Sequence, residues 1–244
     1  MPFLELKSLV RTFGGLRAVD DFSLDLSEGS LNALVGPNGC GKSTLFNLIT
    51  GNLRPDSGTV RFQGRDITGL PPYRIARRGI GRKFQVPAIF DELTVRENLV
   101  VAGRRRGDDA EISRILTQTR LSAAHQDPAG ELAHGQKQWL EIGILLAQRP
   151  SLILLDEPTA GMTPAETEAT VDLILEINER QNITILVIEH NMGFIEHLAC
   201  PLHVMSKGKR LKSGDFASIR GDEDVHELYF GRREPAAAEA QPYA

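Results

Sequence analysis

The chain has 244 residues and a formal net charge of −4 at pH 7, and 41% of its residues are hydrophobic. This length suits one sizeable core with a smaller subdomain, and the slightly acidic balance argues against a general nucleic-acid binder. Cys40 and Cys200 are its two cysteines, so no disulfide framework is indicated. We expect neither a secretory signal nor a membrane span, because no apolar run has the required length.

Short apolar runs alternate with helical patterns along the chain. Residues 3–26 predict short strands joined by a Gly-Gly turn, and residues 92–147 are predominantly helical. Later strands are predicted at Leu31–Val35, Leu152–Asp156, Thr184–Ile188 and residues 202–205, with helices at residues 164–179 and Met192–Leu198. The pattern favours an α/β fold: a mostly parallel sheet with an N-terminal antiparallel β subdomain and an inserted helical subdomain.

The segment GPNGCGKST lies between a predicted strand and a predicted helix. It matches G-x-x-x-x-G-K-[ST], in which backbone N–H groups and the helix N-terminus cradle phosphates. Lys42 would reach the β- and γ-phosphates, and the Ser43 hydroxyl would bind Mg²⁺. A plain Gly-rich turn is the alternative, but a chance match arises on the order of once in a hundred such chains. The predicted nucleotide contacts are Gly36, Pro37, Asn38, Gly39, Cys40, Gly41, Lys42, Ser43 and Thr44.

The segment LILLDEP ends a predicted buried strand with two carboxylates, Asp156 and Glu157. Open α/β sheets keep ligands at the carboxyl ends of their strands. Asp156 would hold Mg²⁺, and Glu157 would orient or deprotonate the attacking water. The alternative is that these residues only cap a helix.

The segments GPNGCGKST, HGQ, LILLDEPTAG and VIEH occur in this order along the chain. Their order resembles that of an ATP-binding-cassette ATPase, and the resemblance covers residues 3–231. The resemblance implies a P-loop NTPase core in one domain, residues 1–231, with the helical subdomain at about 92–147. Residues 232–244 are rich in Ala, Pro and Glu and are expected to form a disordered tail. In this family a nucleotide is sandwiched between the phosphate loop of one subunit and the signature segment of the other.

The signature segment here is LAHGQ, residues 132–136, where the family usually has LSGGQ. The resemblance implies that His134, Gly135 and Gln136 contact the nucleotide of a partner, with backbone N–H groups directed at its γ-phosphate. Alone, the segment could be an ordinary helix start. Ala133 lacks the usual serine hydroxyl, and Thr163 stands where an aspartate is frequent.

Three further residues match family positions. Gln85 resembles the loop glutamine that senses Mg²⁺ and contacts the transmembrane partner, and His190 resembles the switch histidine that contacts the γ-phosphate. Phe13 resembles the aromatic residue that stacks on adenine, although it could equally belong to the core. We therefore expect three catalytic residues: Glu157, His190 and Gln85. We expect Mg²⁺ to be bound by Ser43, Gln85 and Asp156.

The segments FGGLRAVDDFSL, FDELTVRENL and EHNMGFIEHL resemble ATP-binding subunits of branched-chain amino acid and amide importers, and HGQKQW resembles most the urea-type subunit. The resemblance implies an ATPase on the cytoplasmic face of the membrane that dimerises over two Mg-ATP and drives uptake of urea or a related amide. Its partners would be transmembrane permease subunits, a second ATPase subunit and, indirectly, a solute-binding protein, with no nucleic acid. The alternatives are a branched-chain amino acid importer, a soluble non-transport cassette and a module that binds nucleotide without hydrolysis.

Overall fold

The computed structural model describes residues 2–83, 89–103 and 109–225. Its strands are β1 (Leu4–Phe13), β2 (Leu16–Leu26), β3 (Leu31–Val35), β4 (Ser57–Phe62), β5 (Arg65–Asp66), β6 (Ile80–Lys83), β7 (Leu152–Asp156), β8 (Thr184–Ile188), β9 (Leu202–Ser206) and β10 (Lys209–Gly214). The helices are α1 (Lys42–Ile49), α2 (Pro72–Arg77), α3 (Val95–Ala102), α4 (Asp109–Gln118), α5 (His134–Ala147), α6 (Pro164–Gln181), α7 (Met192–Leu198) and α8 (Phe216–Arg220), with a 3₁₀ turn at Ala129–Glu131.

A six-stranded sheet forms the centre of the molecule, in the order β10-β9-β3-β8-β7-β6. Its strands run parallel except for β10, which pairs antiparallel with β9. Side chains alternate between two cores: Leu152 and Leu154 of β7 face one, and Ile153 and Leu155 face the other. Burial on both faces explains the continuous apolar runs, and the predicted mostly parallel sheet is confirmed.

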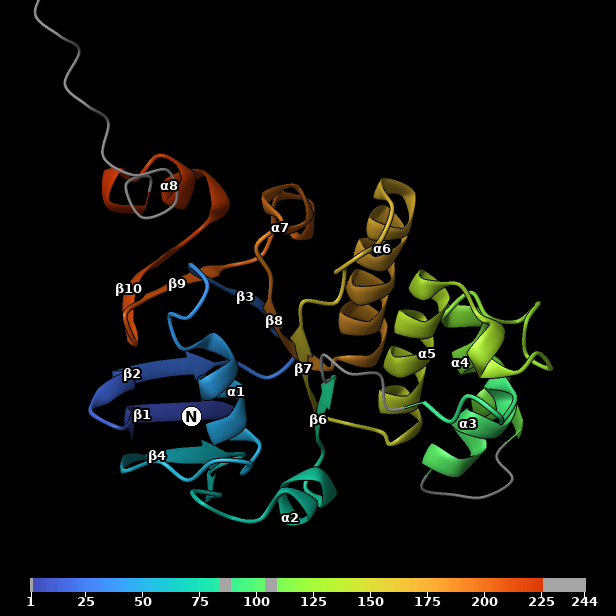
Figure 1. Ribbon diagram of the computed structural model, residues 1–244, viewed down its shortest axis with the longest axis horizontal. Coiled ribbons are helices and arrows are strands. Elements are labelled where there is room, and N and C mark those ends of the chain that lie inside the picture. Colours follow the sequence, from blue (N-terminus) through green and yellow to red (C-terminus); the bar gives the residue numbers. More distant parts are fainter. Residues whose placement is uncertain (1, 84–88, 104–108, 226–244) are drawn as a thin grey trace, which may run out of the picture.

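One face of this sheet is covered by α1 and a four-stranded antiparallel sheet, in the order β2-β1-β4-β5 (Figure 1). The predicted N-terminal hairpin is confirmed, since β1 pairs with β2 across Gly14 and Gly15, both with positive φ. Sequence patterns did not indicate β4 and β5, which extend this sheet. Phe46 of α1 is fully buried between the two sheets, which fixes the helix behind the phosphate loop.

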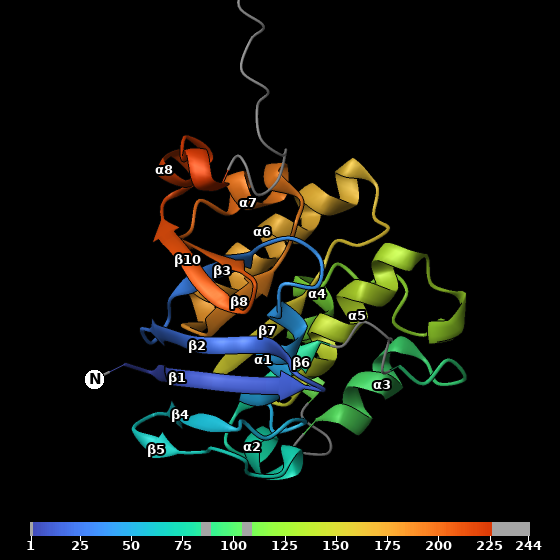
Figure 2. The same ribbon diagram turned by 60° about the vertical axis from the view of Figure 1, so that its left-hand side comes forward.

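The other face is covered by α6 and α7, and α3, α4 and α5 gather beside them (Figures 1 and 2). Gly143 of α5 allows α3, α4 and α5 to pack closely. A Cβ there would lie 3.1 Å from Leu99 Cδ2 and 3.2 Å from Ile115 Cγ2. Within the described residues, no helix combines the length and apolarity that crossing a bilayer requires.

The strand order brings the functional segments together. Strands β3, β8 and β7 are neighbours and run parallel, so their carboxyl ends meet at one edge of the sheet. The phosphate loop (residues 36–44) follows β3, the carboxylate loop (residues 157–163) follows β7, and the histidine loop (residues 189–191) follows β8. This is the edge where open α/β sheets bind ligands.

Candidate functional site

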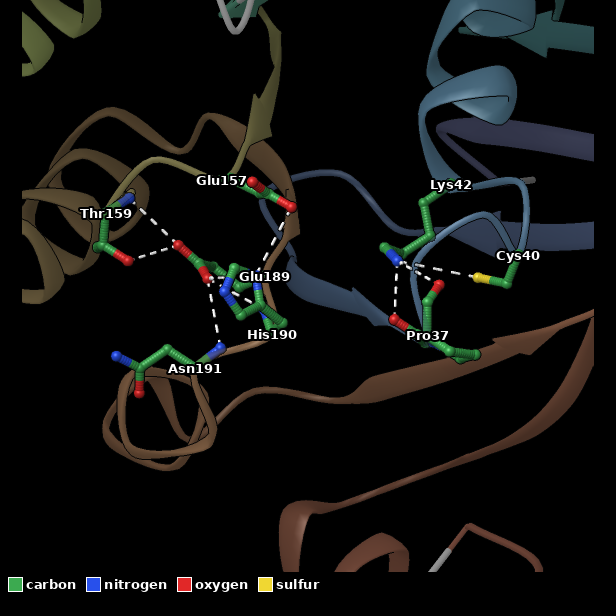
Figure 3. A network of polar contacts seen from close by, with 9 residues as sticks. Pro37, Cys40, Lys42, Glu157, Thr159, Glu189, His190 and Asn191 are labelled. Atoms are coloured by element: carbon green, nitrogen blue, oxygen red, sulfur yellow. Dashed lines mark hydrogen bonds and ion pairs between the residues drawn. The ribbon is translucent and has the colours of Figure 1, made fainter. Parts of the chain in front are cut away.

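The phosphate loop is held by its own lysine. Lys42 begins α1, is buried, and donates from Nζ to the carbonyl oxygens of Gly36 at 2.7 Å and Pro37 at 3.0 Å (Figure 3). Gly39 has φ +76°, and a Cβ at this position would meet no other atom within 4 Å, so the loop backbone is open there. The ammonium and the helix N-terminus thus face the same loop, which fits the binding of an anion such as a nucleotide phosphate.

Close backbone packing fixes where the loop sits. A Cβ on Gly41, whose φ is +114°, would lie 2.1 Å from the Ala18 carbonyl oxygen, and one on Gly36 would lie 2.2 Å from that of Met205. The loop is therefore wedged against β2 and β9. Burial raises the pKa of the Cys40 thiol, although the ammonium of Lys42, 3.8 Å from the sulfur, lowers it.

Asp156 is paired within the chain. Its Oδ2 accepts from the Arg82 guanidinium at 3.0 Å, and both side chains are less than a tenth exposed. Arg82 also donates to Asn47 Oδ1 at 2.6 Å and lies over the Phe46 ring. Burial lowers the pKa of Arg82, while Asp156 opposes that shift. Arg82 was not identified from the sequence as a functional residue. A charged residue within a short, largely buried strand could have indicated that it has a buried partner.

Glu157 and His190 lie on adjacent loops. Glu157 Oε1 is 3.6 Å from His190 Nδ1, and both side chains are accessible, at 27% and 61% exposure (Figure 3). The Glu157 backbone adopts φ +48° and donates its N–H to the Ile188 carbonyl oxygen at 2.9 Å. A left-handed conformation is unfavourable for glutamate and is typical of residues whose side chain has to be aimed. The structure therefore brings together the two side chains expected to act on the γ-phosphate.

Glu189 was not identified from the sequence as a functional residue. Its carboxylate is 1% exposed and lies between the carboxylate loop and the histidine loop (Figure 3). Thr159 donates to Oε1 from its backbone N–H at 3.1 Å and its hydroxyl at 2.5 Å. The backbone N–H groups of His190 and Asn191 donate to Oε2 at 3.0 and 3.4 Å.

The oxygen ligands near the phosphate loop suit Mg²⁺. Ser43 exposes its hydroxyl in the first turn of α1, and Asp156 supplies a carboxylate from β7. In the part of the chain that the structure describes, no cluster of three or more His, Cys, Asp or Glu side chains could hold a metal alone. Mg²⁺ typically binds through one or two protein oxygens together with water and substrate phosphates, and Ser43 and Asp156 provide two such oxygens.

Phe13 ends β1 and is 43% exposed, so the core alternative is wrong. The guanidinium of Arg11 lies 4.8 Å from the ring centroid, and Asp56 binds that guanidinium at 3.0 Å. One face of the ring is thus covered by a cation. The exposed remainder is available for stacking on a base.

The signature segment opens α5 with few side-chain partners. Gln136 Oε1 accepts the Ala133 N–H at 3.0 Å, but Ala133 has no oxygen to cap the helix in return. His134 Nε2 lies 2.9 Å from the Ala160 carbonyl oxygen of the same chain. A neutral imidazole has one N–H, so while His134 donates to Ala160 it has no donor left for a partner's phosphate.

Thr163 and Gly135 meet at the start of α6. The Thr163 hydroxyl accepts the Glu166 N–H at 3.3 Å, and Glu166 Oε2 accepts the Thr163 N–H at 2.8 Å, a full capping box. The Thr163 N–H and hydroxyl both donate to the Glu166 carboxylate, and these two bonds lower the pKa of Glu166. Threonine therefore supplies the cap that the more frequent aspartate would give. A Cβ on Gly135 would lie 2.3 Å from Glu166 Oε1, so close packing also requires this glycine.

Two predictions lie outside the described residues: the role of Gln85 and the disordered tail at residues 232–244. The other expected residues of the nucleotide site divide into two groups. Those of the phosphate, carboxylate and histidine loops share one edge of the sheet, whereas Gly135 and Gln136 belong to α5, which packs with α3 and α4.

Comparison with known proteins places this architecture among transport ATPases. The family model described as "ABC transporter" matches residues 19–160. The chain is 36% identical to the high-affinity branched-chain amino acid transport ATP-binding protein BraF of Pseudomonas aeruginosa, covering 94% of this chain and 98% of the relative. LivG of Salmonella typhimurium, of the same description, gives the same values. A nucleotide-free ATP-binding cassette from an ABC transporter superposes with a TM-score of 0.86 at 32% identity, covering 95% of this chain and 100% of that one. Both relatives are named for branched-chain amino acid transport, and neither is named for urea transport.

Proposed function

Since the chain belongs to the ATP-binding-cassette transporter family and is an ATPase that uses ATP with Mg²⁺, we propose that it powers an importer of branched-chain amino acids. The observation that carries the proposal is the shared edge of the sheet, where Lys42, Asp156, Glu157 and His190 extend from three neighbouring strands. The similarity to BraF along nearly the whole chain supports the cargo.

Nucleotide binding is assigned to the phosphate loop. The backbone N–H groups of residues 38–44 surround the phosphates, and Lys42 exchanges its contacts with Gly36 and Pro37 for phosphate oxygens. Ser43 and Asp156 would hold Mg²⁺, which would neutralise phosphate charge. Phe13 stacks on the adenine through its exposed ring.

Hydrolysis is assigned to Glu157 and His190, with Gln85 in a supporting role. Glu157 orients and deprotonates the attacking water, since its carboxylate is accessible and aimed by the turn after β7. His190 lies within reach of the same space and donates to the γ-phosphate. Gln85 follows β6 closely and is proposed to contact the metal and the permease.

A second subunit completes the site. Ala133 leaves the first turn of α5 without a side-chain cap, so the N–H groups at Gly135 and Gln136 are free to bind the γ-phosphate of a partner's ATP. His134 acts within its own chain by holding Ala160. The partner is either a second copy or a different ATPase subunit.

Closure of the dimer would move permease subunits docked on the cytoplasmic side of the membrane, with a solute-binding protein delivering the cargo on the other side. The experiment is to purify the tagged chain with its permease from its native host and reconstitute the complex in vesicles. Uptake of [¹⁴C]leucine and [¹⁴C]urea is then measured with ATP, with the Glu157→Gln complex as the matched inactive control.

ATP-dependent leucine uptake that the Glu157→Gln complex lacks would support the proposal. Urea uptake without leucine uptake would overturn the branched-chain cargo in favour of urea. ATP hydrolysis with uptake of neither solute would contradict both cargoes.

A further inference from the structure

We propose that Glu189 is a positioning residue for ATP hydrolysis: its buried carboxylate ties the carboxylate loop to the histidine loop, so that Glu157 and His190 keep one mutual arrangement. The inference rests on the proposed roles of Glu157 and His190. Neither of those roles requires Glu189 to touch the nucleotide.

The contacts of Glu189 divide evenly between the two loops. Oε1 receives both donors of Thr159, from the carboxylate loop, and Oε2 receives the N–H groups of His190 and Asn191, from the histidine loop. Glu189 itself belongs to the histidine loop, so Oε2 binds its own loop while Oε1 reaches Thr159 in the carboxylate loop. With four donors around it, a carboxylate at 1% exposure is fully compensated.

The backbone at Glu157 needs such a restraint. Its φ of +48° is a conformation that a glutamate holds only when its surroundings over-determine it. The N–H of Glu157 donates to the Ile188 carbonyl oxygen at 2.9 Å, on the near side, and Thr159 is bound to Glu189 on the far side. Residues 157–159 are thus fastened at both ends to the segment that carries His190.

The arrangement at the site follows from these bonds. Glu157 Oε1 and His190 Nδ1 are only 3.6 Å apart, although the two side chains are accessible and come from different strands. Their spacing is set by backbone anchors, because the direct contact is long for a hydrogen bond. Loss of the Glu189 link would leave the Glu157–Ile188 backbone bond but free the rest of the carboxylate loop from the histidine loop. A misplacement of about 1 Å can reduce turnover about 100-fold.

The test is Glu189→Gln in the purified, permease-bound complex. An amide keeps the shape but has one acceptor oxygen, so its NH₂ must face N–H donors on one of the two loops. We expect kcat to fall about tenfold to 100-fold, with an unchanged Kd for ATP by titration calorimetry. We also expect the losses from Glu189→Gln and His190→Ala to be less than additive, because part of the effect of Glu189 passes through His190.

Thr159 provides a second variant that leaves the histidine loop intact. Thr159→Val removes the hydroxyl bond to Oε1 at nearly constant volume and should lower kcat, whereas Thr159→Ser retains the hydroxyl and should keep the parent rate. If Glu189→Gln fails to fold, this pair carries the test.

Parent kcat in both Glu189→Gln and Thr159→Val, while His190→Ala is slow, would overturn this inference alone. Equal losses in Thr159→Val and Thr159→Ser, or additive losses with His190→Ala, would also overturn it. Parent turnover in His190→Ala would overturn the proposed role of His190 together with the inference.

Discussion

The two halves of the proposed nucleotide site differ in how their polar groups are satisfied. At the sheet edge, Lys42 binds carbonyl oxygens, Asp156 binds Arg82, and Glu189 binds donors of two loops, all within one chain. At the start of α5, Ala133 supplies no cap, and Gln136 satisfies only the N–H that precedes the helix.

The difference indicates a division of labour. The sheet edge is pre-organised and needs only nucleotide and Mg²⁺ to become a binding site. The start of α5 presents backbone N–H groups and a helix dipole without a side-chain cap, which suits a negatively charged ligand. The chemistry should therefore depend most on the first half, and affinity between subunits on the second.

The largest effect is expected at Glu157. Glu157→Gln removes the general base but keeps the side-chain size, so turnover should fall by about 10²–10⁴ while ATP binding persists. Phosphate release from the permease-bound complex measures the rate, and titration calorimetry measures the affinity. Glu196→Gln, on exposed α7 surface, is the matched control. Turnover at the parent rate in Glu157→Gln would contradict the assignment of Glu157 as the general base at the sheet edge.

Arg82→Met tests whether the sheet edge depends on internal pairing. Breaking a buried ion pair should lower the free energy of unfolding by about 3–5 kcal/mol, because Asp156 is left buried without this partner. Arg180→Met is the control: it breaks a 2.9 Å pair with Glu176 at an exposed site and should cost less than about 1 kcal/mol. Urea unfolding in the absence of nucleotide measures the free energy of unfolding of both variants.

The double variant Arg82→Met, Asp156→Asn sharpens this test. It removes both charges, so it should be less destabilised than the sum of the single changes. Additive losses would mean that Arg82 stabilises the fold through Phe46 and Asn47 rather than through Asp156.

Much of the fold could be predicted because its signals are local. The runs at β3, β7 and β8 are apolar on both faces, and the Gly-Gly turn marks the β1–β2 hairpin. Strands β4 and β5 escaped prediction because they lack a continuous apolar run. Strand β4 pairs with β1, with Phe62 opposite Leu4 far away in the sequence, and β5 pairs with β4. No periodicity within one segment reports such a contact.

The motif at residues 36–44 could be recognised because it spans consecutive residues. Contacts between residues of different strands could not be predicted in this way. Arg82 and Glu189 act through contacts with Asp156 and Thr159, which sequence spacing does not reveal. The direction of His134 could not be predicted either, since it depends on how α5 meets the carboxylate loop.

A smaller effect is expected at Lys42. Lys42→Ala removes charge-assisted hydrogen bonds to phosphate worth about 1.5–3 kcal/mol, which corresponds to a loss in ATP affinity of about tenfold to 100-fold. Lys212→Ala, at an exposed pair with Asp222, should leave affinity unchanged. Titration calorimetry compares the two, and equal affinities would contradict the assignment of the phosphate loop.

The smallest effect is expected at Ala133. A substitution there directly tests the start of α5, the second half of the proposed site. Ala133→Ser supplies the missing acceptor and completes a capping box with Gln136, so unfolding of the lone chain should cost about 1 kcal/mol more. Thr163→Ala removes the complete box on α6 and should destabilise by a similar amount. Urea unfolding that shows the loss at Thr163 without the gain at Ala133 would mean that the first turn of α5 is already satisfied, and the two halves would then not differ as described.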